Sequence, residues 1–234
     1  MNDQGIKTAF LAAFPYTVPI LAGFLFLGMT YGVYMNVLGF SFVYPLLMSL
    51  CIYAGSMEFV AAGLLLGAFQ PVQALALTLM INARYLFYGL AMLDKFRDTG
   101  LKKIYLIFGM CDETFSVNCA ATVPPGVDKG WFYFFVTLLN QMYWVAGATL
   151  GGLLGPFIPL NTTGLDFVMT AMFVVIFLEQ WRKEPKKRNC LLGLGITLVC
   201  RLVFGPDSFL IPAMLCLLLA LTLLRRQGEG GEAQ

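Results

Sequence analysis

The sequence predicts an all-α polytopic membrane protein, and three observations lead to this fold class. Hydrophobic residues make up 59% of the 234 residues. Charged residues make up only 12%, whereas an average soluble domain carries about 25%. Apolar runs of about 20 residues, the length that crosses a bilayer as a helix, recur along the chain. We therefore expect one transmembrane domain over 1–234 in a cell membrane.

Seven apolar segments have the length and composition of membrane spans: 10–33, 41–69, 71–93, 131–154, 162–181, 189–204 and 208–224. The span 41–69 is long and contains Gly55 and Ser56, so we expect it either to tilt or to break there. The segment 104–123 begins apolar but meets acidic residues midway. It is therefore a candidate for a re-entrant or broken helix, which is tolerated only when packed in protein.

Basic residues cluster in 95–103, 182–188 and 225–226, and these clusters predict the topology. Cytoplasmic loops are enriched in lysine and arginine. All three clusters face the cytoplasm if 104–123 does not cross fully. This solution gives seven spans, an external N-terminus, an external loop at 155–161 and a cytoplasmic C-terminus. Lys7 is then the one cation near a span on the outside.

Two short matches suggest an internal repeat. The run 28–32 recurs as 147–151, and the run 84–87 recurs as 201–204, although 58–60 also matches 166–168. We expect two halves of three spans each in opposite orientation, an arrangement that places a transport site near the membrane midplane. The expected parts are the halves 10–93 and 131–205, the connector 94–130 with its re-entrant segment, a last helix 208–224 and a disordered tail 227–234.

The composition excludes several classes of function. The sequence has no histidine, and its six cysteines lack paired short spacing, so no metal site, cofactor or disulfide framework is expected. A net charge of +2 does not suggest a nucleic-acid partner. No Gly-x-x-x-x-Gly-Lys-Ser/Thr run is present for ATP binding. The motifs of zinc proteases and serine hydrolases are also missing, so an enzyme is not expected.

Charged residues inside apolar segments are the candidates for substrate binding or coupling. Such a side chain costs roughly 2.5–3.5 kcal/mol on insertion scales, so it usually has a partner and faces a protein interior or a water-filled path. Asn82, Arg84 and Arg201 either line such a path or extend to the membrane surface. The acidic candidates are Glu58, Asp112, Glu113 and Asp166.

The acidic candidates and the glycine pairs each have a plainer interpretation. Glu58 binds a proton or a substrate amine, or it is a hydrogen-bonded carboxyl group inside the bundle. Asp112 and Glu113 belong either to the polar path or to a loop. The glycine pairs are spaced for close helix packing, which needs no ligand. These pairs are Gly28 with Gly32 and Gly147 with Gly151.

Four motifs, in this order, resemble those of the AzlC family over about 10–224. They are Tyr53-Ala54-Gly55-Ser56-Met57-Glu58-Phe59, Asn82-Ala83-Arg84-Tyr85-Leu86-Phe87-Tyr88-Gly89, Asp112-Glu113-Thr114-Phe115 and Gly164-Leu165-Asp166-Phe167. The resemblance implies the large subunit of a branched-chain amino acid exporter that works with a small AzlD-like membrane subunit. Many members carry glutamine at the Glu58 position, which argues against a strict role for this carboxylate across the family.

Together these features predict a secondary exporter of branched-chain or similar apolar amino acids. Arg84 or helix N-termini near the breaks would hold the substrate carboxylate. Glu58 or Asp166 would hold its ammonium group, and Met57, Phe59 and Phe87 would pack on its side chain. Proton coupling would use carboxylates. Two other functions stay open: a non-coupled facilitator or channel, and a membrane assembly subunit that transports nothing.

Overall fold

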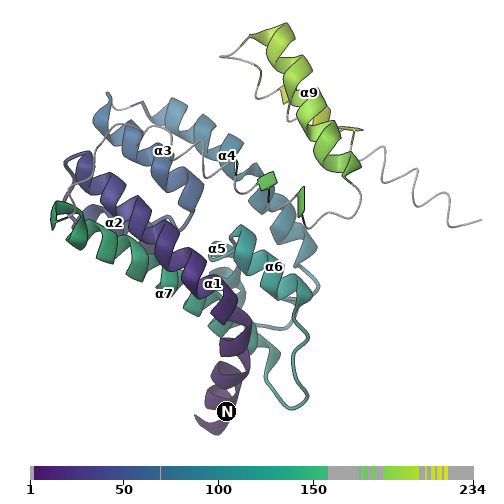
Figure 1. Ribbon diagram of the computed structural model, residues 1–234. Helices are drawn as coiled ribbons and strands as arrows, with labels where there is room; N and C mark the ends of the chain where they lie inside the picture. Colours follow the sequence, from purple (N-terminus) through teal and green to yellow (C-terminus); the bar gives the residue numbers. More distant parts are fainter. Residues whose placement is uncertain are drawn as a thin grey trace, which may run out of the picture. The chain divides into compact units, whose positions relative to one another are not determined.

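The computed structural model describes residues 3–68, 70–157, 174, 177–178, 181–182, 187–205, 209, 212–213, 215–217 and 219–220. The chain forms two compact units, Met1–Leu165 and Asp166–Gln234, which are coloured along the sequence in Figure 1. Every regular element among the described residues is a helix, as the composition predicted. The expected spans 162–181 and 208–224 and the tail 227–234 lie largely or wholly outside the described residues.

Three long helices and four short ones build the first unit. The long helices are α1 (Asp3–Val37), α4 (Pro71–Ala91) and α7 (Lys129–Leu154). The short helices are α2 (Val43–Cys51), α3 (Gly55–Leu66), α5 (Lys102–Phe108) and α6 (Asp112–Ala120). A single 3-10 turn, η1 (Gly155–Phe157), follows α7. The second unit contains α9 (Arg188–Phe204).

Helices α1 and α7 pack directly against each other at the predicted glycine pairs. A Cβ atom at Gly28 would lie 2.8 Å from the Trp144 carbonyl oxygen, and one at Gly147 would lie 2.7 Å from the Leu25 carbonyl oxygen. At Gly32 and Gly151, the other member of each pair, a Cβ atom would have even less room. Only glycine allows the two backbones to approach this closely. The packing role predicted for these glycines is therefore confirmed.

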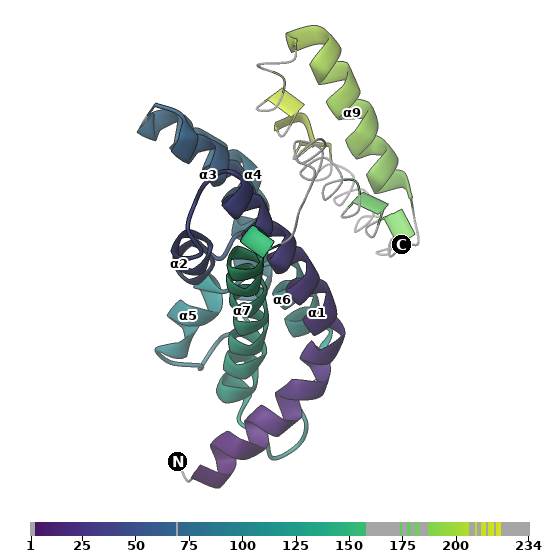
Figure 2. The ribbon, with the colours of Figure 1, turned by 60° about the vertical axis from the view of Figure 1, so that its left-hand side comes forward.

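The contacts also show that α1 and α7 run parallel. Phe10 stacks edge-on against Phe135 near the start of both helices, and Asn36 lies against Gly155 at their ends. Figure 2 shows the two helices side by side in the same direction. The inverted repeat requires opposite directions for these two segments, so that prediction is wrong for 10–33 and 131–154. The matching glycine runs reflect one shared packing interface.

The expected span 41–69 is a hairpin, the first hairpin, made of α2 and α3. Gly152 on α7 lies against Phe42, and Gln141 donates a hydrogen bond to the Leu50 carbonyl oxygen. Helix α2 therefore descends along α7 toward its middle. The helix breaks at residues 52–54, and α3 then pairs antiparallel with α4. The break expected near Gly55 is confirmed, but the chain turns back instead of crossing.

The segment 104–123 forms the second hairpin, made of α5 and α6. At its start Lys102 lies over the Trp131 ring, and at its tip a Cβ atom on Gly109 would meet Thr137. Helix α6 then returns, because Thr122 at its far end accepts a hydrogen bond from Tyr16. The sequence did not decide whether this segment crosses the membrane, is re-entrant or is a broken helix. The structure shows a broken helix that turns back.

The two hairpins enter from opposite ends of the first unit. We call the end where α1 and α7 begin the basic end, because the chain segments there carry Lys7, Lys95, Arg97, Lys102, Lys103 and Lys129. Helix α4 descends to the basic end, where Met92 packs in a cluster with Ala13, Leu106 and Phe132. The second hairpin enters from the basic end and the first from the opposite end, so their tips meet inside.

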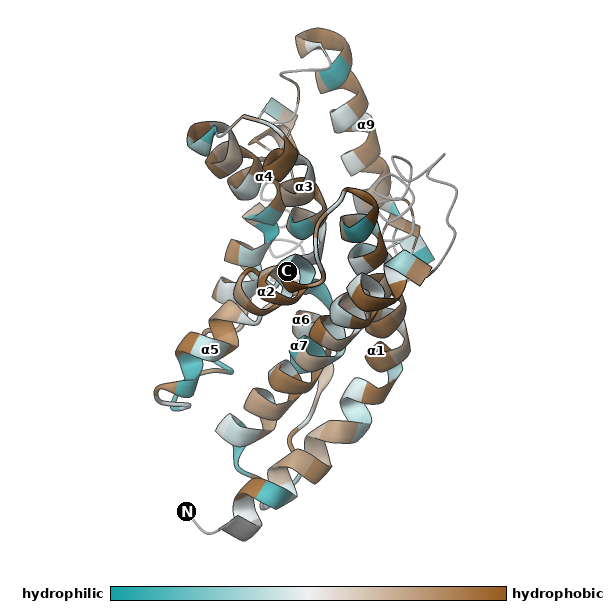
Figure 3. Cartoon of the chain, turned by 90° about the vertical axis from the view of Figure 1, so that its left-hand side faces the viewer, coloured by the Kyte–Doolittle hydropathy of each residue, from teal (hydrophilic) through white to brown (hydrophobic). Residues whose placement is uncertain are grey.

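Long apolar helices with uncovered side chains suit a membrane. Residues Gly5–Val37 and Ala74–Ala91 are long and apolar enough to cross one. Helix α7 has 26 residues, about 39 Å at 1.5 Å per residue. Large side chains such as Leu11, Val72 and Leu86 are exposed, and Figure 3 shows hydrophobic residues along most of α1 and α7. Lipid would cover these faces.

Candidate functional site

The tips of the two hairpins bring polar groups together halfway along α4 and α7. Helices α3 and α6 both begin at this level, so both N-termini, which carry partial positive charge, point into it. We call the polar side chains of these two first turns, with Arg84 of α4 and Asn140, Gln141 and Trp144 of α7, the polar layer. The layer contains four of the predicted site residues, which are Glu58, Arg84, Asp112 and Glu113.

Arg84 and Asp112 form an ion pair that joins α4 to the second hairpin. The Arg84 Nη2 atom lies 2.9 Å from Asp112 Oδ2, and the side chains are 30% and 21% exposed. The same nitrogen donates to Ser56 Oγ at 3.3 Å, which ties the pair to the first turn of α3. Tyr88 donates a hydrogen bond to Asp112 Oδ1 at 2.7 Å. Arg84 therefore does not extend to the surface.

Glu58 is fully buried at the break between α2 and α3, and both of its carboxyl oxygens accept hydrogen bonds. Its Oε1 accepts a hydrogen bond from the Ala54 backbone N–H at 3.1 Å. The indole N–H of Trp144 donates to both carboxyl oxygens at 3.1 Å. The bond to Ala54 satisfies one of the free N–H groups at the start of α3, as a capping residue does. Both partners are donors, so the hydrogen-bonded interpretation of Glu58 describes this site.

A second chain of contacts links the two tips and reaches α7. Tyr53 has a φ of 45°, in the left-handed region that favours glycine. Its hydroxyl lies 3.7 Å from Cys111 Sγ, and that sulfur lies 3.1 Å from Thr114 Oγ1. Asn140 donates from Nδ2 to the same Thr114 oxygen at 3.2 Å. The strained Tyr53 backbone thus lies where the hairpins touch, and such strain often concentrates at functional sites.

Glu113, the fourth predicted site residue in the polar layer, follows Asp112 in the first turn of α6 and is half-buried. The remaining predicted site residues are placed differently. Asn82 lies on α4, and its buried Oδ1 makes no hydrogen bond with a described residue. Arg201 lies in the last turn of α9 in the second unit, exposed, with its guanidinium 6.0 Å from the Phe209 ring centre. Asp166 lies outside the described residues.

The three residues expected to pack on a substrate side chain do not lie together in the structure. Met57 is buried and lines a cavity of about 540 Å³ between α2, α3 and α4. Phe59 is buried against the rings of Tyr31 and Tyr34. Phe87 is 49% exposed on the outer side of α4. Only Met57 of these three therefore borders open space beside the polar layer.

Sequence reasoning missed the contribution of α7. Asn140 and Gln141 are buried halfway along this helix, and Gln141 Oε1 accepts a hydrogen bond from Tyr105 at 2.6 Å. Trp144, one turn further along α7, donates its indole N–H to Glu58. The available signal was the pair Asn140-Gln141 in the middle of the expected span 131–154. Two amides at that depth need partners, as charges do.

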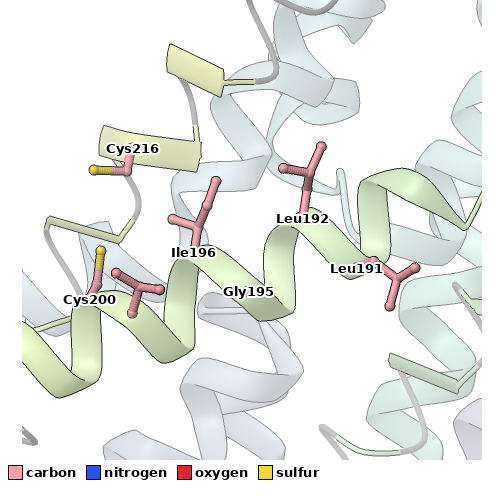
Figure 4. Close-up of a pocket in the computed structure, with 7 residues that line it drawn as sticks. Leu191, Leu192, Gly195, Ile196, Cys200 and Cys216 are labelled. Carbon is pink, nitrogen blue, oxygen red and sulfur yellow. The ribbon is translucent and has the colours of Figure 1, made fainter.

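The second unit has a groove of different character. It has a volume of about 770 Å³ and is lined by apolar residues of α9 together with Cys200 and Cys216. In Figure 4, Leu192, Ile196 and Cys200 extend from one side of α9 while Leu191 points away. Among the described residues of this unit, none that lines the groove is charged. The polar layer, which combines charged and polar groups, is the better candidate site.

Comparisons with known proteins find a matching family model and several curated relatives. The family model described as AzlC protein matches residues 19–158. The chain is 63% identical over 233 residues to the branched-chain amino acid transport protein AzlC of Bacillus subtilis, covering 99% of this chain and 92% of that protein.

Two further relatives are named only as membrane proteins. An uncharacterized membrane protein of Haemophilus influenzae is 52% identical, with 95% of this chain and 91% of the relative covered. The inner membrane protein YgaZ of Escherichia coli is 25% identical, with 72% of this chain and 71% of the relative covered. No solved structure matches the chain.

Proposed function

This chain belongs to the AzlC family, and on that premise we propose that it is the large subunit of a secondary transporter that exports branched-chain or similar apolar amino acids. Its Bacillus subtilis relative is named a branched-chain amino acid transport protein. The substrate is a zwitterion with an apolar side chain. The site must therefore combine charged or polar groups with an apolar surface, inside a membrane protein.

The Arg84–Asp112 ion pair is the observation that carries this proposal. A charged pair inside an apolar bundle marks a substrate or ion path more often than a structural contact. The Arg84 Nε atom makes no hydrogen bond with a described residue, so the guanidinium retains a donor for an incoming carboxylate. The N-termini of α3 and α6 add partial positive charge at the same level. Arg84 is therefore our candidate for the carboxylate-binding residue.

The cavity beside the polar layer supports an apolar substrate side chain. Among the residues that line it are Met57, Ala61 and Leu64 of α3, three residues of α2, and Thr78 near the middle of α4. A leucine or valine side chain gains roughly 1.5–3 kcal/mol from full burial in such a place. The carboxylate would bind at Arg84 and the side chain would enter this cavity.

A small AzlD-like membrane subunit is the expected partner. Gly63 is exposed on α3, and apart from its chain neighbours and its own helix backbone, no described residue has an atom within 4 Å of a Cβ atom placed there. A helix from a partner could approach closely at such a position. Coupling, where present, uses carboxylates because the sequence has no histidine and no Gly-x-x-x-x-Gly-Lys-Ser/Thr run for ATP.

Transport assays test the proposal against its alternatives. The full chain, with and without the candidate small subunit, would be reconstituted in proteoliposomes and supplied with radiolabelled leucine. We expect flux that needs both subunits and responds to an imposed pH gradient. Flux that only follows the leucine gradient would indicate a facilitator. A complete lack of flux in the presence of the partner would indicate an assembly subunit.

A further inference from the structure

Three buried amide atoms between α6 and α7 lack hydrogen-bond partners among the described residues. They are Oδ1 and Nδ2 of Asn118 and Oδ1 of Asn140. Both side chains are 0% exposed. A buried polar group without a partner costs about 1–3 kcal/mol, and native structures contain few of them. Unpaired amide atoms on Asn118 of α6 and on Asn140 of the neighbouring α7 therefore point to a polar ligand.

Two of the three atoms belong to Asn118 on the second hairpin, and the third belongs to Asn140 on α7. Asn118 follows Thr114 by four residues, about one helical turn, so both side chains project from the same side of α6. Thr114 Oγ1 accepts the one hydrogen bond that Asn140 makes, at 3.2 Å. Helix α6 runs from the polar layer toward the basic end, where Lys95 donates to the carbonyl oxygens of Asn118 and Cys119. Asn140 thus belongs to the polar layer, and Asn118 lies between that layer and the basic end.

The chemistry of the unpaired atoms selects a ligand. Two are carbonyl oxygens, which accept hydrogen bonds, and one is an NH₂ group, which donates. An ammonium group carries three donors and satisfies both oxygens at once, whereas a carboxylate satisfies only the NH₂ group. Asp112 and Glu113 also lie in the first turn of α6, and Glu113 forms no ion pair among the described residues.

We propose that Thr114, Asn118 and Asn140 form a binding site for the ammonium group of an α-amino acid, on the side of the polar layer nearer the basic end. This inference rests on the proposed function, which supplies the amino acid. It assigns the ammonium group to neutral amides in place of Glu58, whose oxygens are already bound by Ala54 and Trp144. Arg84 keeps the role of binding the carboxylate.

The test compares L-leucine with its 2-hydroxy analogue, which has the same carboxylate and side chain but no ammonium group. Both would compete for leucine transport by the full chain in proteoliposomes, with the small subunit present where transport needs it. In the wild type the hydroxy acid should compete at least tenfold more weakly than leucine. Asn118→Leu and Asn140→Leu should raise the half-saturating leucine concentration at least tenfold and remove most of this preference.

Two further variants separate binding from folding. Asn140→Asp keeps the side-chain size and adds negative charge, so it should increase the preference for leucine over the hydroxy acid. Thr137→Val is the matched control, because Thr137 is buried on α7 one turn before Asn140 and bonds only to the Tyr133 carbonyl oxygen. It should leave the preference unchanged.

The outcomes distinguish the two proposals. A wild type that moves no amino acid contradicts the proposed function itself. A transporting wild type whose leucine preference is unchanged in Asn140→Asp overturns the ammonium site alone, and this holds even where the leucine variants do not fold. Equal loss of leucine and hydroxy-acid binding in folded Asn118→Leu would likewise show that the amides bind only water or support packing.

Discussion

At the residue scale, Glu58 and Arg84 differ in the kind of contact they make. Glu58 accepts hydrogen bonds from a backbone N–H and an indole N–H, both neutral donors. Arg84 binds a charged partner and keeps one donor free. The sequence could place both inside the membrane, but it could not separate these roles, because the partner Trp144 is 86 residues from Glu58.

Glu58→Gln should therefore have a small effect. The glutamine carbonyl oxygen can still accept from Ala54 and Trp144, so leucine export should stay within about threefold of the parent, less than 1 kcal/mol. Glu58→Leu removes both acceptors and should lower the melting temperature in detergent, since each buried donor left unpaired costs about 1–3 kcal/mol. A severe transport loss in a stable Glu58→Gln protein would instead assign Glu58 to coupling.

Arg84→Lys should reduce leucine export at least tenfold, which corresponds to about 1.4 kcal/mol. Lysine keeps the charge but loses the planar fork that contacts Ser56 and Asp112 while a further N–H stays free. Export would be measured as resistance of cells to toxic leucine analogues at matched membrane expression. Arg97→Lys is the control, because Arg97 is exposed near the basic end. Normal resistance in Arg84→Lys cells would remove Arg84 from the substrate path.

At the element scale, the sequence predicted the helix breaks but not the direction of the chain after them. Gly55-Ser56 and the acidic residues of 104–123 marked both breaks, because such residues interrupt an apolar run visibly. Whether a broken helix continues or turns back depends on contacts with distant helices. The hydrogen bond from Gln141 to Leu50 fixes the first hairpin against α7, and no local pattern encodes it.

The α1–α7 interface gives a prediction at the same scale. Gly32→Ala should destabilise the protein strongly, because its Cβ atom would overlap the Ala148 carbonyl oxygen and the neighbouring backbone of α7. The two helices would have to move apart along their contact. Gly23→Ala is the matched control on the same helix, since nothing lies within 4 Å of a Cβ atom there. Melting temperatures should fall for Gly32→Ala only, and equal values would argue against tight packing at Gly32.

At the scale of the whole molecule, the hairpins change the predicted topology. Neither hairpin crosses the membrane. Along the chain, α4 is therefore the one described segment that crosses it between the parallel helices α1 and α7. The six lysine and arginine residues that define the basic end then lie on the same side of the membrane. The positive-inside rule places this end in the cytoplasm. The N-terminus is cytoplasmic in this arrangement, contrary to the prediction from sequence, and Lys7 is no longer an exception. A cytoplasmic 95–103 and an external 155–161 stay as predicted.

Cysteine labelling tests this topology where the two arrangements differ most. If α2 and α3 form a hairpin, Ser41 before it and Ala68 after it lie on the same, external side; if 41–69 crosses, they lie on opposite sides. Both residues are exposed, as is Asp98 near the basic end. Single cysteines would be introduced at these positions after replacing the six native cysteines, and an impermeant thiol reagent would be added to intact cells. We expect labelling of Ser41→Cys and Ala68→Cys, and labelling of Asp98→Cys only after permeabilisation. Labelling of only one of the first two would show that the segment crosses the membrane, and the polar layer could not then be formed by two opposed hairpins.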